Sequence, residues 1–246
     1  MHERGLADSR QKAQALILAG RILVNGQKIT KAGSTVPVES AVDVIGSVMP
    51  YVGRGGLKLA AAIERWSITP AGLTALDIGS STGGFTDCLL QNGAARVHAV
   101  DSGTNQLDWK LRSDPRVHLL ENTNARYLTF AQIGEQVDMV CIDVSFISVR
   151  LILPALTQFC RQGTRLVLLI KPQFEAGREQ VGKGGIVRDE AVRASVVASV
   201  SQAVAEADFQ ALEVIACPIL GAAGNQEYLL NGFFARRQPS RPFEPV

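Results

Sequence analysis

The chain has 246 residues, of which 46% are hydrophobic and 20% charged, a composition that supports a packed core and argues against extensive disorder. A net charge of +2 is too small to indicate a nucleic-acid-binding protein by itself. The four cysteines form no Cys-x-x-Cys pair, no signal-peptide pattern opens the sequence, and the apolar runs have only strand length, so we expect a soluble cytoplasmic protein with buried thiols and no membrane segment.

Residues 1–46 are predicted to form a small α+β module. Its expected elements are a helix over 11–19 with Asp8 or Ser9 as the N-cap, a strand over 21–24, a turn at Asn25-Gly26, a strand over 27–29, and extended segments over 36–38 and 42–45. Residues 1–56 hold seven Lys or Arg against four Asp or Glu, whereas the remainder holds 18 against 19. Basic side chains of the short N-terminal part are therefore the preferred contacts for phosphate.

After a Gly- and Pro-rich connector at 47–56, helices alternate with short apolar strands over 57–246. Strands are expected at 75–78, 97–100, 117–121, 139–143, 166–170, 212–217 and 228–234, and helices at 58–66, 85–92, 148–159 and 190–207. This alternation predicts an α/β fold, a Rossmann-like, doubly wound and mostly parallel sheet covered on both faces. In such sheets, ligands bind beyond the carboxyl ends of the strands.

A glycine-rich loop follows the first of these strands, in the sequence Leu76-Asp77-Ile78-Gly79-Ser80-Ser81-Thr82-Gly83-Gly84-Phe85. Its D-x-G-x-x-x-G-G pattern differs from the G-x-G-x-x-G spacing of a dinucleotide-binding loop. Asp101 ends the next strand, where a carboxylate can accept both hydroxyls of a ribose, and Asn122 follows the third, where it can contact adenine. Together they favour S-adenosylmethionine as the cofactor of a methyltransferase.

Four further polar residues stand where this fold places its chemistry. Asp143 ends the fourth strand, Lys171 follows the fifth, Glu227 begins the last, and Lys58 opens the first helix of the large domain. A charge at the end of an element is usually only a surface residue. A lysine directly after five apolar residues and before a proline is less ordinary, because it projects from the sheet edge into the crevice.

At this point the chain resembles the TlyA, or hemolysin A-like, family, which joins an S-four-like RNA-binding module to an FtsJ-like ribose 2′-O-methyltransferase domain. The matching motifs span residues 9–13, 20–26, 54–59, 77–85, 143–146, 171–175 and 182–185. The family usually has a basic segment and a first apolar helix turn before Glu3, so the start codon is expected to be misassigned or the RNA module trimmed.

The resemblance implies a catalytic tetrad of Lys58, Asp143, Lys171 and Glu227, with ribosomal RNA as the partner and a cytidine ribose as the methylated position. We expect the cofactor to contact Asp77, Gly79, Ser80, Ser81, Gly83, Gly84, Phe85, Asp101, Asn122 and Asp143. RNA phosphates are expected to contact Arg10, Lys12, Arg21, Lys28 and Lys31. Lys171 is the candidate base for the hydroxyl proton, helped by the nearby charge of Lys58. No metal is expected, since no His, Cys and carboxylate cluster suggests one.

Three other functions compete with this interpretation. A pore-forming hemolysin would need membrane-length or amphipathic segments, which the sequence lacks. A non-catalytic RNA-binding protein would not need the four polar residues, and a small-molecule methyltransferase would not need the basic module. The target nucleotide, its subunit and the oligomeric state stay open.

Overall fold

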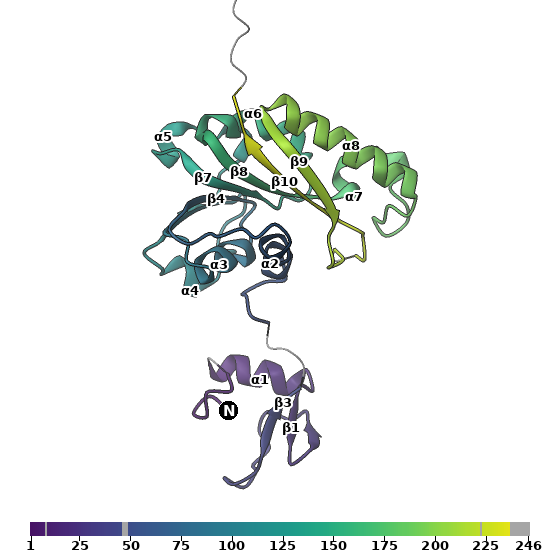
Figure 1. Ribbon diagram of the computed structural model, residues 1–246. Helices are drawn as coiled ribbons and strands as arrows, with labels where there is room; N and C mark the ends of the chain where they lie inside the picture. The colour runs from purple at the N-terminus through teal and green to yellow at the C-terminus, as the bar shows by residue number, and fades with distance from the viewer. Residues whose placement is uncertain (8, 46–48, 222, 237–246) are drawn as a thin grey trace, which may run out of the picture. The chain divides into compact units, whose positions relative to one another are not determined.

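The computed structural model describes residues 1–7, 9–45, 49–221 and 223–236, and the chain divides into two compact units, Met1–Pro50 and Tyr51–Val246 (Figure 1). The predicted connector at 47–56 spans this division. Residues 46–48 lie outside the described residues. Residues 51–56 belong to the larger unit, where the Val52 backbone N–H donates to Asp87 Oδ2 at 2.9 Å.

The smaller unit consists of one helix and a three-stranded antiparallel sheet in the order β2–β1–β3. Its elements are α1 (Arg10–Leu18), β1 (Ile22–Val24), β2 (Gln27–Ile29) and β3 (Val42–Val44). Ser9 caps α1 by accepting the Lys12 backbone N–H at 3.1 Å, while Asp8 lies outside the described residues. Asn25 and Gly26 both have positive φ, as a tight hairpin turn requires. The extended segment expected at 36–38 is not a strand.

The larger unit is built on a seven-stranded sheet in the order β6–β5–β4–β7–β8–β10–β9. Its strands are β4 (Thr74–Ile78), β5 (Arg96–Val100), β6 (Val117–Leu120), β7 (Val137–Ile142), β8 (Cys160–Ile170), β9 (Phe209–Ala216) and β10 (Tyr228–Phe234). Strands β4 to β8 pair in parallel, and β10 runs antiparallel to both of its neighbours, β8 and β9. The predicted mostly parallel sheet is therefore confirmed.

Helices cover both faces of this sheet (Figure 1). One face carries α2 (Gly55–Arg65), α3 (Gly84–Gln91) and α4 (Trp109–Arg112), and the other carries α5 (Phe130–Ile133), α6 (Leu153–Leu156) and α8 (Glu190–Glu206). A short helix, α7 (Pro172–Glu175), follows β8 directly. Because side chains alternate along a strand, β4 sends Leu76 and Ile78 to the α6 face and Ala75 to the α2 face.

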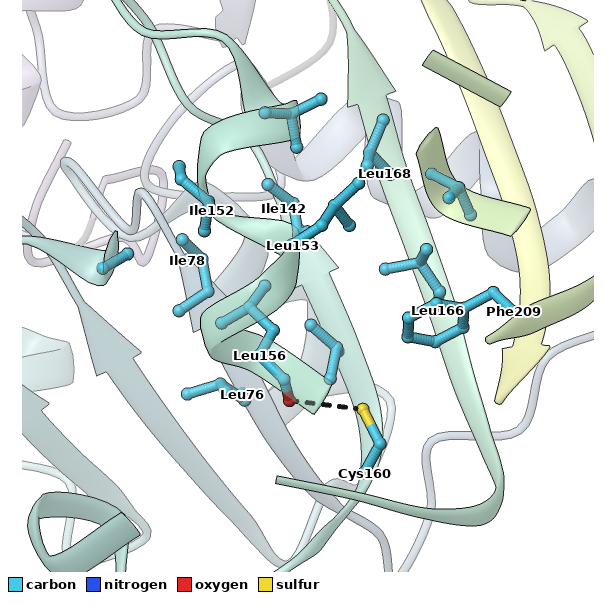
Figure 2. Close-up of a cluster of buried hydrophobic side chains, with 14 of the residues drawn as sticks. Leu76, Ile78, Ile142, Ile152, Leu153, Leu156, Cys160, Leu166, Leu168 and Phe209 are labelled. Atoms are coloured by element: carbon cyan, nitrogen blue, oxygen red, sulfur yellow. Dashed lines mark hydrogen bonds between the residues drawn. The ribbon is translucent and has the colours of Figure 1, made fainter. Parts of the chain in front are cut away.

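The core on the α6 face packs aliphatic side chains of neighbouring strands against the short helix α6 (Figure 2). Ile78 and Ile142 lie with Leu153 and Leu156 in this cluster, and the Cys160 thiol donates to the Leu156 carbonyl oxygen at 3.5 Å. All four cysteines are buried and free, as expected from their apolar surroundings. This rigid layer fixes the ends of β4 and β7, from which the loops of the site emerge.

Two sequence-based boundaries are wrong. The single helix expected over 148–159 is broken into the 3-10 turn η2 (Val149–Leu151), α6 and the 3-10 turn η3 (Thr157–Phe159). Pro154 lies in the first turn of α6, the one place where its missing N–H leaves no helical hydrogen bond unmade. Strand β8 begins at Cys160 rather than at 166, because its first half is largely polar and hydropathy gives no strand signal there, although it pairs with β7.

Candidate active site

The loop between β4 and α3 has a backbone that only glycine allows at its start. Gly79 has a φ of +84°, and a Cβ placed there would lie 2.4 Å from the Asp143 carbonyl oxygen. Gly84 at the start of α3 is equally confined, since its Cβ would lie 2.8 Å from the Gly56 backbone nitrogen. The glycines therefore let the loop pass close to the end of β7 on one side and to the start of α2 on the other.

Asp101, at the end of β5, holds this loop in place. Its Oδ2 accepts the Ser81 backbone N–H at 2.8 Å, and its Oδ1 accepts the Gly103 backbone N–H at 2.7 Å. Each oxygen has a second lone pair, so the carboxylate can still accept hydroxyl groups of a ligand. The predicted position of Asp101 beside the glycine loop is therefore realised, although its first partners are backbone groups.

Asp77 lies beneath the loop and is completely buried. Thr86 Oγ1 donates to its Oδ2 at 2.6 Å, while Oδ1 has no hydrogen-bond partner among the described residues. Desolvation is the main reason that the pKa of this carboxyl is raised to about 7, and the Thr86 hydrogen bond opposes the shift. Asp77 lines neither of the cavities described next, and through Thr86 its side chain is joined to α3.

Two cavities open beside the loop, of about 460 and about 150 Å³. They share four lining residues, Gly79, Ser81, Asp143 and Ser145. Because they share these lining residues, the two cavities are adjacent, and they are called the large and the small compartment of the site below. The large compartment is of the size that small-molecule cofactors occupy.

The predicted cofactor residues divide between these compartments. Those lining the large compartment are Gly79, Ser81, Asp101 and Asp143, and those lining the small one include Ser80, Gly84 and Phe85. Asp77, Gly83 and Asn122 line neither.

The two residues after Asn122, Thr123 and Asn124, do line the large compartment. Glu121, the residue before Asn122, accepts a hydrogen bond from Arg112 Nη2 at its Oε1, at 2.6 Å. Gln106 and Phe146 also line it and were missed. Gln106 lies in an irregular loop with no motif to mark it.

Two ion pairs bring the four predicted catalytic residues together. Lys171 Nζ lies 2.5 Å from Asp143 Oδ1 and donates to Ser145 Oγ at 2.9 Å. Lys58 Nζ lies 2.5 Å from Glu227 Oε2, and both residues are buried. Ser145, missed by the sequence analysis, lies in the loop after β7, two residues beyond Asp143, and could have been found from that position.

Antiparallel pairing of β10 with β8 explains how residues so far apart in sequence meet. Tyr228 pairs with Ile170, so continuing the register by one residue places Glu227 opposite Lys171. Gln173 reinforces this link, because its Nε2 donates to Glu227 Oε1 at 3.5 Å. The lysines are thus each neutralised by their own carboxylate, an arrangement that separate positions in the sequence did not reveal.

The basic residues expected to contact RNA lie in the smaller unit. Arg10 and Lys12 belong to α1, Arg21 precedes β1, Lys28 lies in β2, and Lys31 follows it. All are exposed except the half-buried Arg21, whose Nε donates at 3.1 Å to a backbone carbonyl after β3. This unit therefore presents positive charge from several elements rather than from one helix.

Two of the three histidines, His98 and His118, lie together at residues that line neither cavity. His98 Nδ1 lies 2.9 Å from His118 Nδ1, and its Nε2 lies 3.1 Å from Glu135. Desolvation lowers the pKa of His98 below 6.5. Within the described part of the chain, no group of three His, Cys, Asp or Glu could hold a metal ion, and no helix has the length and apolarity of a membrane span.

Comparisons with known proteins agree with this site. Residues 51–234 match the family described as FtsJ-like methyltransferase, and residues 1–42 match the S4 domain. The 16S/23S rRNA (cytidine-2′-O)-methyltransferase TlyA of Mycobacterium tuberculosis is 46% identical over 228 residues, which cover 92% of this chain and 85% of that protein. Hemolysin A of Brachyspira hyodysenteriae is 41% identical over 230 residues, which cover 93% of this chain and 95% of that protein.

A solved structure from Streptococcus thermophilus, provisionally named a hemolysin, is 40% identical and superposes with a TM-score of 0.76 over 98% of this chain and 89% of that one. The resemblance drawn from the sequence motifs is confirmed, and the fold, the glycine loop and the paired lysines agree with it. The chain belongs to the FtsJ-like methyltransferase family, in the TlyA group, and also carries an S4 domain.

Proposed function

We propose that this protein transfers a methyl group from S-adenosylmethionine to the ribose 2′-hydroxyl of a cytidine in ribosomal RNA. The observation that carries the proposal is the Lys171–Asp143 pair beside Ser145, where the two compartments of the site meet. A methyl donor in one compartment and a hydroxyl in the other would face each other across this pair. The relatives named as rRNA methyltransferases supply the substrate class.

The large compartment suits the cofactor. Gly79 and Ser81 line it from the glycine loop, Asp101 offers free lone pairs to ribose hydroxyls, and Thr123 and Asn124 supply polar groups beyond β6. A Cβ at Gly79 would close the space between this loop and β7, which is a reason for glycine at that position. S-adenosylmethionine, when bound, supplies an electrophilic methyl group.

Proton removal from the hydroxyl is assigned to Lys171 and Asp143 acting as one unit. An amine is a base only when neutral, and a carboxylate 2.5 Å away stabilises its ammonium form. When the amine is protonated, the Asp143 carboxylate beside it is the remaining base of the pair and can accept the hydroxyl proton. Ser145 keeps the Lys171 Nζ oriented by accepting one of its hydrogens.

Lys58 and Glu227 have a supporting role in this proposal. Their buried ion pair lies beside the Lys171 position through the β8–β10 register, and it holds the start of α2 against the end of the sheet. Alignment of the two substrates supplies much of the acceleration in a transfer of this type, so a rigid frame around the pair matters as much as the base.

The S4 unit is proposed to hold the RNA. Its exposed basic residues Arg10, Lys12, Lys28 and Lys31 can contact phosphates, which position a structured RNA without reading its sequence. Ribosomal RNA or a ribosomal subunit is then the partner, and the reaction takes place in the cytoplasm.

The test is methyl transfer from labelled S-adenosylmethionine to ribosomal subunits that lack the modification, followed by mapping of the methylated nucleotide. We expect label on a cytidine ribose with the wild-type protein and with Lys110→Ala, which removes an exposed lysine outside the site. Lys171→Ala should bind the cofactor but transfer no measurable label. Label on a base, or no label on RNA from the wild-type protein, would contradict the proposal.

A further inference from the structure

Glu175 closes the short helix α7, four residues after Lys171, and its side chain is only 5% exposed. Its Oε2 accepts the Ser148 hydroxyl at 2.6 Å, and its Oε1 accepts the Val149 backbone N–H at 2.7 Å. Arg150 Nε lies 3.4 Å from Oε2 and compensates its charge. A buried carboxylate thus joins α7 to the segment that follows β7.

That segment, residues 143–149, is called the β7 loop below. At its beginning, Asp143 and Ser145 contact Lys171, and at its end, Ser148 and Val149 contact Glu175. Lys171 and Glu175 belong to one stretch of five residues, which therefore contacts the β7 loop at both of its ends. Two fixed ends leave the residues between them little freedom to move.

The middle of the β7 loop is strained. Phe146 has a φ of +65°, a region that costs a residue with a bulky side chain about 1–3 kcal/mol and persists only when its surroundings impose it. The Phe146 ring is 91% exposed and meets the Phe174 ring of α7, with the centroids 5.0 Å apart. The hydrogen bonds of Glu175 and Lys171 on either side are the contacts that can hold this conformation.

We propose that Glu175 is a positioning residue for methyl transfer, acting through the β7 loop; this inference rests on the function proposed above. Glu175 sets where the loop runs relative to Lys171 and thereby where Asp143 and Ser145 stand around the amine. Ser148 Oγ already accepts the Arg150 backbone N–H at 3.3 Å and the Arg150 Nε–H at 3.1 Å, so its own hydrogen is left to donate to Glu175. A carboxylate suits this position, because the hydroxyl and the Val149 backbone N–H both donate to its two oxygens. An amide would turn its NH₂ group toward one of these donors.

The cofactor is held mostly by other elements. Gly79, Ser81 and Asp101 come from the loops after β4 and β5, with which no Glu175 hydrogen bond is formed among the described residues, whereas the β7 loop contributes residues 143–147 to the lining of the large compartment. A disturbance of the β7 loop should therefore harm the transfer step much more than cofactor affinity. This difference separates positioning from a general loss of folded protein.

The experiment compares Glu175→Gln with Glu179→Gln, which removes the same charge from an exposed site four residues further on. Cofactor affinity is measured by calorimetry, and kcat on unmodified ribosomal subunits is expressed per cofactor-binding site, so that unfolded protein is not counted. We expect kcat of Glu175→Gln to fall roughly 10- to 100-fold, as misplacement by about 1 Å can cause, with cofactor Kd changed less than about threefold. Glu179→Gln should match the wild type in both.

Ser148→Ala is the second variant, since it removes one donor and leaves the Glu175 charge in place. It should lower kcat in the same direction by a smaller factor, which keeps the test decisive if Glu175→Gln does not fold. The inference is overturned if kcat per site is unchanged in the variants that fold, or if it falls only in proportion to cofactor affinity. If the wild-type protein and Glu179→Gln also transfer no methyl group, the proposed function itself has failed.

Discussion

Replacing Gly79 by alanine tests the geometry of the site most directly. The new Cβ would stand 2.4 Å from the Asp143 carbonyl oxygen and 2.9 Å from its carbonyl carbon. Ordinary contacts between such atoms begin near 3.5 Å, so the end of β7 or the glycine loop must move by roughly 1 Å. Asp143 forms an ion pair with Lys171 and lines the large compartment, so this movement would displace both the proposed proton acceptor and part of the compartment wall.

The expected effect of Gly79→Ala has two parts, a loss of stability and a loss of methyl transfer. A non-glycine residue at a φ of +84° is destabilised by about 1–2 kcal/mol, which for a domain of this size lowers Tm by roughly 2–8 °C. The 1 Å displacement adds a loss of roughly 100-fold in the rate of methyl transfer. We also expect cofactor Kd to rise about tenfold, since the affected loop lines the cavity.

Gly134→Ala separates the two parts. Gly134 has a φ of +81°, and a Cβ there meets nothing within 4 Å, so this variant carries the backbone strain without the collision. Tm, cofactor Kd by calorimetry and single-turnover methyl transfer should be measured for both proteins. Gly134→Ala should have a lower Tm, with cofactor Kd and methyl transfer unchanged. The reasoning is refuted if Gly79→Ala binds the cofactor and transfers methyl groups as well as Gly134→Ala does.

Three further outcomes follow from the contacts of the site and the core. Lys171→Ala should lower methyl transfer by roughly 10²- to 10⁴-fold with unchanged cofactor affinity, measured by calorimetry and single-turnover assays. Lys58→Met should destabilise the protein by about 3–5 kcal/mol in urea unfolding, because it leaves Glu227 buried and unpaired, and adding Glu227→Leu should restore much of the stability without restoring activity. Burial lowers the pKa of His98 below its unfolded value of 6.5, so the unfolded state binds protons more readily and the free energy of unfolding should decrease as the pH falls below about 6.5. His98→Gln should flatten that decrease, and an unchanged slope would show that other groups cause it.

Short-range physics made much of this protein predictable from its sequence. Alternating apolar strands and helices indicated the parallel sheet, and the hairpin at Asn25-Gly26 followed from turn preferences. The glycine-rich pattern after an apolar strand indicated a ligand-binding loop, and in the structure that loop lines both cavities. Each of these signals depends on a few neighbouring residues, so a single sequence carries it in full.

Tertiary structure alone decided which groups meet. Lys58 pairs with Glu227 across 169 residues, and the register of β10 against β8, rather than any local motif, brings that carboxylate beside Lys171. Glu175 likewise finds its donors in a loop that precedes it by 26 residues. A hydrogen bond or ion pair forms only between groups that lie close together in space. Local preferences indicate which residues form a strand, but not which strand they will pair with. The sequence therefore determined the fold class and the kind of chemistry, and the packed sheet determined the pairing of charges that we propose performs it.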